Sequence, residues 1–173
     1  MFDGGEPMAL IDGLLQELEQ EAQTTRRVLE RVPDKLDWRP HPKARSLGQL
    51  AMHVAIIPGA LAELATSPSP AQVPNFTDPI PASVSELVPT LDESVAKSKR
   101  ILSGIDDATL FETWRLMQGE REVFAVPRLV ILRSIMLNHW YHHRGQLSVY
   151  LRELDVPIPS IYGPSADENP FAD

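Results

Sequence analysis

The fold is decided by the stretch Leu137-Asn138-His139-Trp140-Tyr141-His142-His143-Arg144-Gly145-Gln146-Leu147, residues 137–147 of 173. It is the middle of a longer segment in which apolar residues and histidines recur in steps of three and four: Leu132, Met136, His139, His143, Leu147, Tyr150 and Leu154. Such steps place side chains on one face of an α-helix. We therefore predict a helix from about Pro127 to Leu154, ended by Pro157 and Pro159.

Three earlier segments show the same period. The first runs from about Pro7 to Val32, with the inward stripe Ile11, Leu14, Leu18, Ala22, Thr25, Leu29 and Val32. The second begins at the capping box Ser46-Leu47-Gly48-Gln49, and Pro58 is expected to kink or divide it because proline removes a backbone donor. The third begins at another capping box, Ser83-Val84-Ser85-Glu86, and ends at Gly104.

The connections between these helices are long. Residues 67–82 are rich in proline and predict an extended link. Residues 105–126 lack a clear period and predict either a short β-hairpin or an irregular loop, and the tail from about 158 to 173 is expected to be extended. We therefore predict an all-α protein, a four-helix bundle with long crossover connections that forms a single domain over residues 1–173.

Composition restricts the classes of function. The formal net charge is −8 and no cluster of lysine and arginine stands out, so we expect no nucleic-acid partner. The chain has no cysteine, which excludes disulfides, thiolate ligands and a cysteine nucleophile. The N-terminus lacks the pattern of a signal peptide, and no apolar run is judged long enough to span a bilayer, so we expect no membrane partner and a cytoplasmic location.

Three of the five histidines lie on inward stripes. His53 belongs to the stripe of the second helix, and His139 and His143 are four residues apart on the last helix. That spacing puts two imidazoles on one face, one turn apart, where both can reach one ion. Three imidazole ligands leave coordination positions open, as in catalytic zinc sites. The alternative is that each histidine is hydrogen-bonded separately in the core.

The other two histidines have weaker claims. His142 could pair with His139 at a spacing of three, but the apolar stripe favours His143. His41 lies between two prolines and is expected to be exposed. The motifs of zincins, di-iron carboxylate bundles, serine hydrolases and nucleotide-binding loops are all missing from the sequence.

Three segments together resemble the bacterial DinB/YfiT-like family. They are Val32–Pro40, the run Ser46-Leu47-Gly48-Gln49-Leu50-Ala51-Met52-His53-Val54-Ala55, and residues 137–147 followed by Tyr150-Leu151-Arg152. The run His142-His143-Arg144-Gly145-Gln146 is the most specific part. The resemblance implies a four-helix bundle with a long crossover, a three-histidine site for Zn²⁺ or Ni²⁺, and a homodimer. Relatives with known activity include metal-dependent S-transferases and isomerases that use low-molecular-weight thiols.

The leading hypothesis is therefore a metal-dependent transferase that activates a small-molecule thiol for attack on an electrophilic substrate. His53, His139 and His143 would be metal ligands only. Gln146 and Arg144 are candidates to support the ligands or to bind an anionic substrate group. The alternatives for these two residues are a packing glutamine and a surface arginine.

Two rival functions are retained. The first is a metal-dependent hydrolase that uses activated water, for which Glu63, ten residues after His53, lies too far along the helix to be the general base. The second is a non-catalytic, stress-associated metal-binding module. Trp140 and Tyr141 would then lie either on a dimer face or in the core.

Overall fold

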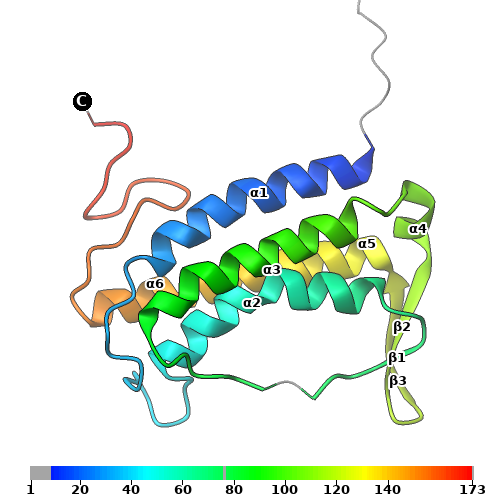
Figure 1. Ribbon diagram of the computed structural model, residues 1–173, viewed down its shortest axis with the longest axis horizontal. Coiled ribbons are helices and arrows are strands. Elements are labelled where there is room, and N and C mark those ends of the chain that lie inside the picture. Colours follow the sequence, from blue (N-terminus) through cyan, green and yellow to red (C-terminus); the bar gives the residue numbers. More distant parts are fainter. Residues whose placement is uncertain (1–8, 76, 173) are drawn as a thin grey trace, which may run out of the picture.

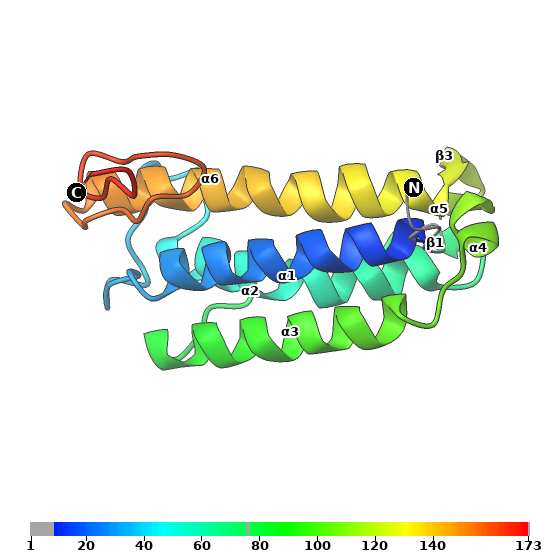
Figure 2. The same ribbon diagram turned by 90° about the horizontal axis from the view of Figure 1, so that it is seen from above.

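Long helices form where the apolar period predicts them. The computed structural model describes residues 9–75 and 77–172 (Figure 1). Helix α1 spans Leu10–Leu29, and all seven residues of its predicted stripe are buried. Its expected start, Pro7, lies outside the described residues. Helices α2 (Leu47–Thr66) and α3 (Leu87–Leu102) pack against each other, and α1 packs on α3 (Figure 2).

Helix α2 begins at the predicted capping box, in which the Gln49 amide donates to Ser46 Oγ at 3.2 Å and the Ser46 amide donates to Gln49 Oε1 at 2.9 Å. Pro58 does not divide the helix. The carbonyl of Val54, which Pro58 cannot serve, accepts a hydrogen bond from Trp140 Nε1 at 2.9 Å. A side chain from a neighbouring helix therefore replaces the donor that proline lacks.

The contact between α2 and α3 is close at Gly59. A Cβ atom at Gly59 would lie 2.9 Å from the carbonyl oxygen of Ser94, so only glycine fits there. Ser94 Oγ accepts from the Gly59 amide at 2.8 Å and donates to the carbonyl of Ile56 at 3.0 Å. This contact holds α2, which carries His53, against the rest of the core.

The predicted capping box at Ser83 is wrong. Residues Val84–Glu86 form a 3₁₀ turn, η1, before α3 begins, and the Ser83 side chain caps no helix amide. Glu86 Oε1 instead accepts from the amide of Ala82 at 3.2 Å. The link between α2 and α3 runs back along α2, so the two helices point in the same direction (Figure 1).

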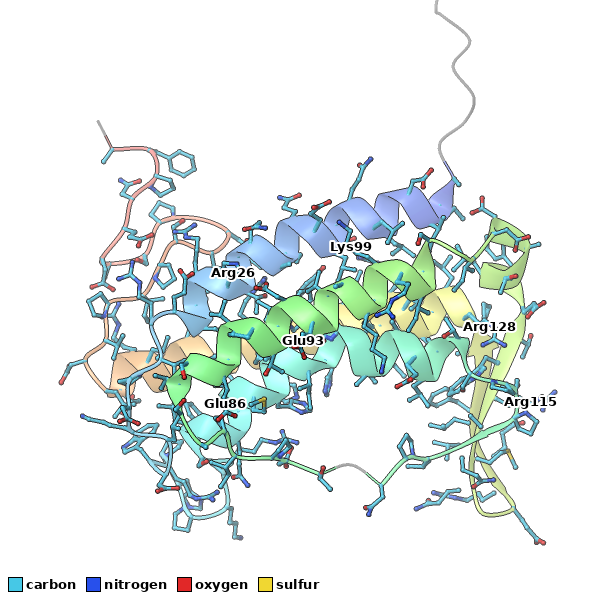
Figure 3. The ribbon with its side chains drawn as sticks, viewed as in Figure 1. Arg26, Glu86, Glu93, Lys99, Arg115 and Arg128 are labelled. Atoms are coloured by element: carbon cyan, nitrogen blue, oxygen red, sulfur yellow. The ribbon has the colours of Figure 1, made fainter. Side chains whose placement is uncertain are left out.

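A small sheet corrects the all-α prediction. Strand β1 (Ala71–Gln72) pairs parallel to β2 (Thr113–Gln118), and β2 pairs antiparallel to β3 (Arg121–Pro127). The β2–β3 hairpin is one of the two forms expected for residues 105–126, and a short helix, α4 (Asp107–Phe111), precedes it. Arg128, labelled in Figure 3, joins this end to α2 by donating to the carbonyl oxygens of Ala65 and Ser67.

The last helix is continuous but not uniform. It consists of α5 (Arg128–Val130), a π-helical stretch η2 (Ile131–Leu137) and α6 (Asn138–Glu153). The wider turns of η2 end at Leu137, two residues before His139. Such insertions are frequent beside functional sites, and nothing in the apolar period indicates this one. The tail after α6 has no helix or strand in its described part, and it reaches the C-terminal end of α1, where Glu168 pairs with Arg27 on the helix and with Arg31 just after it.

The expectation that no apolar run is long enough to span a bilayer is wrong by length and composition. Among the described residues, α2 is long and apolar enough to cross a bilayer by length and composition. However, 67% of that stretch is buried inside the fold. Its hydropathy therefore fits a core helix, because α2 contacts α1, α3 and α6.

Candidate metal centre

Three imidazole rings converge between α2 and α6. His53, His139 and His143 each offer a nitrogen, and these three atoms lie within 4.8 Å of one another. The Nε2 atoms of His53 and His139 are 3.2 Å apart, and the ring centroids of His139 and His143 are 4.3 Å apart. The spacing of four residues on α6 and the facing position on α2 thus bring together the side chains that the sequence singled out.

Polar groups lie behind two of the rings, and one of them is hydrogen-bonded. His143 Nδ1 lies 2.7 Å from Gln146 Oε1, and because an amide oxygen only accepts, Nδ1 carries the proton. Nε2 of His143 is then the atom with a free lone pair. His53 Nδ1 lies 3.8 Å from Asp78 Oδ1, on the side of the ring away from His139. Both arrangements resemble the outer partners that orient metal-bound imidazoles.

The surroundings keep the rings neutral. Burial is the largest cause that lowers the pKa of His53 to about 4, and the neighbouring His143 and Arg45 lower it further, whereas Asp78 raises it. Burial likewise lowers the pKa of His143 to about 4 and depresses that of His139. Neutral imidazole is the form that binds a metal ion, so the cluster is ready to bind near neutral pH without losing a proton.

The donor set fits a divalent ion of the zinc or nickel type. Three neutral imidazole nitrogens lie within 4.8 Å of one another, and imidazole is a suitable ligand for both ions. Separate hydrogen bonding accounts for the cluster less well, because among the described residues one hydrogen bond, between His53 Nε2 and His139 Nε2, joins the three rings. One ion would serve all three lone pairs.

Two pockets open on either side of the cluster. The apolar pocket, of about 320 Å³, is lined by Arg45, His53, Ile56, Ile57, Ala60, Leu61, Thr77, Ile135 and His139. The polar pocket, of about 360 Å³, is lined by Lys43, Ala44, Arg45, Leu50, Asp78, His143, Gln146 and Tyr150. The cluster is therefore accessible to small molecules from two sides of different character.

The remaining predictions at the site have mixed outcomes. His142 and His41 are exposed, and Glu63 pairs with Lys97 at 2.8 Å away from the cluster. Gln146 contacts His143, as expected of a residue that supports a metal ligand. Trp140 is fully buried in the core, and the Tyr141 hydroxyl donates to Glu17 Oε1 at 2.9 Å.

Arg144 does not lie on the surface. Its side chain is 1% exposed and pairs with Glu21 at 2.6 Å. It also donates to Thr25 Oγ1 at 3.0 Å and to the hydroxyl of Tyr162. Arg144 therefore ties α6 to α1 and to the tail, and within the described part of the chain its hydrogen bonds and ion pair are with Glu21, Thr25 and Tyr162.

Sequence reasoning missed Arg45 and Asp78. Arg45 lies in the link before α2, and Asp78 lies in the link between α2 and α3. The two residues meet because the second link runs back along α2 toward its start. The available signal was the position of Arg45 directly before Ser46, the cap residue of α2, which fixes its backbone at the start of the helix that carries His53.

Comparisons with known proteins found a matching family model, a related sequence and similar solved structures. The family model described as "DinB family" matches residues 1–170. The uncharacterized protein YrdA of Bacillus subtilis is 26% identical over 160 residues, covering 91% of each chain. A DinB-like protein from Bacillus cereus superposes with a TM-score of 0.69 at 22% identity, over 87% of this chain and 97% of that one. YjoA, a DinB-like protein of Bacillus subtilis, gives 0.64 at 17% identity, over 86% and 96%.

These similarities agree with the arrangement of the long helices, and the family match extends over almost the whole sequence. The chain belongs to the DinB family.

Proposed function

We propose that this protein is a cytoplasmic, metal-dependent transferase that joins a low-molecular-weight thiol to an electrophilic small molecule. The observation that carries the proposal is the convergence of three neutral imidazoles between two pockets. In this proposal α1, α2, α3 and the last helix form a four-helix bundle of the DinB type, and His53, His139 and His143 hold a Zn²⁺ or Ni²⁺ ion. An ion held there would lower the pKa of a bound thiol, so that it is a thiolate at neutral pH.

The residues of the chain have separate tasks in this reaction. The three histidines supply nitrogen and remain neutral, while Gln146 keeps the proton of His143 on Nδ1. The apolar walls of the pocket beside His53 exclude water, which strengthens electrostatic interactions inside it. Arg45 contributes a positive charge that offsets negative charge arriving with the sulfur.

The chemical balance is simple. The thiol loses its proton to solvent, the sulfur forms a bond with an electrophilic carbon, and the leaving group departs with its bonding electron pair. No oxidant or reductant is required. The protein positions both partners and lowers the cost of forming the thiolate.

The test uses the cobalt-substituted protein. Cysteine, glutathione and coenzyme A are added in turn, and the absorption spectrum is recorded for a sulfur-to-cobalt charge-transfer band. Conjugation to a haloalkane probe is then followed by mass spectrometry, with His143→Ala as the inactive control. The proposal predicts a new band and a thioether product for at least one thiol. No spectral change and no product with any thiol would refute it.

A hydrolase that uses activated water is the second candidate, because one carboxylate does lie at the site. Asp78 lines the polar pocket together with His143, whereas Glu63 is excluded by its position. Hydrolysis of ester or amide substrates by the metal-loaded protein, lost in Asp78→Asn, would favour this candidate over thiol transfer. The homodimer expected from the family resemblance stays a prediction.

A further inference from the structure

The apolar pocket beside the histidine cluster has one charged lining residue, Arg45. Its other walls are four aliphatic residues of α2, Thr77, Ile135 and the rings of His53 and His139. Arg45 also lines the polar pocket, so its guanidinium lies at the boundary between the two. An apolar cavity with a single cation at its edge favours ligands that have an apolar body and a complementary charge at one end of the molecule.

The backbone and side chain of Arg45 are held in place. The next residue, Ser46, caps α2, and the carbonyl of Arg45 accepts from the Tyr150 hydroxyl at 3.4 Å. Arg45 Nε lies 2.9 Å from Asp78 Oδ1, although without the alignment of a hydrogen bond. Among the described residues, no partner binds the two terminal nitrogens of Arg45. They are available to a ligand.

We propose that the apolar pocket binds a small molecule with an apolar body and an anionic head, and that Arg45 is the residue that selects the head. The body would lie against Ile57, Leu61 and Ile135. Calling this molecule the electrophilic substrate rests on the proposed function, whereas its binding does not. A cavity of about 150 Å³ holds one benzene molecule. The pocket, at about 320 Å³, has room for an aromatic ring with a short chain.

Charge and geometry both favour an anionic head. Asp78 is already engaged on the Nε side of Arg45, and among the described residues the apolar pocket has no other charged lining residue. A guanidinium offers its remaining donors in a planar fork that matches a carboxylate, and charge-assisted hydrogen bonds of this type are about twice as strong as neutral ones. A cationic head would face Arg45, the charged residue that lines the apolar pocket.

The experiment compares three probes that share one body and differ in the head: 4-phenylbutyrate, 4-phenylbutanol and 4-phenylbutylamine. Dissociation constants are measured by calorimetry on the full chain, first as isolated and again after treatment with a chelator, because an ion could itself bind the carboxylate. We expect the carboxylate to bind about tenfold more tightly than the alcohol in both forms, and the amine to bind most weakly.

Two pairs of variants separate head recognition from body recognition. Arg45→Gln should abolish the preference for the carboxylate over the alcohol, whereas Lys43→Gln, which changes a cation of the polar pocket alone, should keep it. Ala60→Trp should fill the pocket and weaken all three probes, whereas Ala96→Trp, also at an exposed helical alanine but on α3, should not. Both tryptophans replace exposed alanines, so folding is not at risk.

The inference is overturned if wild type binds the carboxylate and the alcohol equally, or if the preference survives Arg45→Gln. Equal effects of Ala60→Trp and Ala96→Trp would also overturn it, because the body would then bind elsewhere. The assay contains no thiol and requires no ion. Its failure is therefore distinguishable from failure of the cobalt and thioether tests, which address the proposed transferase activity.

Discussion

Removing the side-chain acceptor behind His143 should weaken metal binding without removing a ligand. In Gln146→Leu, Nδ1 of His143 loses the amide oxygen at 2.7 Å that holds its proton. Loss of such outer partners commonly costs 10- to 100-fold in metal affinity. Gln146 is exposed, so water can partly replace the lost hydrogen bond, and the low end applies. We expect the dissociation constant for Zn²⁺ to rise about tenfold, which corresponds to about 1.4 kcal/mol.

The assay is competition with a chromophoric chelator at fixed pH. Gln23→Leu is the matched control, because it makes the same change at an exposed helical position on α1, away from the cluster. Gln146→Glu should restore or increase affinity, since a carboxylate accepts the Nδ1 proton more strongly. Equal Zn²⁺ affinities for Gln146→Leu and Gln23→Leu would refute the assigned role of the 2.7 Å contact.

Three further outcomes follow from the contacts. The stability of the metal-free protein, measured by thermal unfolding, should fall as the pH drops from about 6.5 to about 4. The reason is that His53 takes up a proton in the unfolded state at a higher pH than in the folded state, where its pKa is lowered to about 4. Stability that does not change with pH in that window would contradict the lowered pKa. Arg144→Met should cost about 3–5 kcal/mol in denaturant unfolding, since it leaves Glu21 buried and unpaired, and a loss below about 1 kcal/mol would contradict a buried pair. Trp140→Phe should lower the free energy of unfolding by about 1–3 kcal/mol, because the Val54 carbonyl loses its donor. Adding Pro58→Ala should recover part of this loss, because the alanine amide can donate to the same carbonyl. Strictly additive losses in the double variant would argue that the indole N–H does not replace the missing proline amide.

The periodic part of the fold was predictable, because burial of one face dictates the spacing of apolar residues. The α1 stripe and the Ser46 capping box were predicted correctly. The Ser83 capping box failed because a 3₁₀ turn precedes α3 and Glu86 binds the amide of Ala82 instead. The small sheet depends on pairing between β1 and β2, in which Ala71 lies opposite Leu116, and no local pattern indicates pairing between residues so far apart in the sequence.

At the site, the sequence identified residues on helices and missed residues in links. The spacing of His139 and His143, and the inward position of His53, follow from helical geometry alone. Arg45 and Asp78 meet the cluster only through the path of the crossover. The alternative that Arg144 lies on the surface was wrong, because its partners Glu21 and Tyr162 come from α1 and the tail, which no local pattern connects to it.

The measurement that tests the central claim most directly is the metal content of five purified proteins at equal concentration. If the three convergent imidazoles hold one ion, wild type and His142→Ala should each carry one equivalent of Zn²⁺ or Ni²⁺ after loading and desalting. His53→Ala, His139→Ala and His143→Ala should each lose most of it. Equal metal content in His142→Ala and His143→Ala would contradict the account, because these neighbours differ in whether they face the cluster.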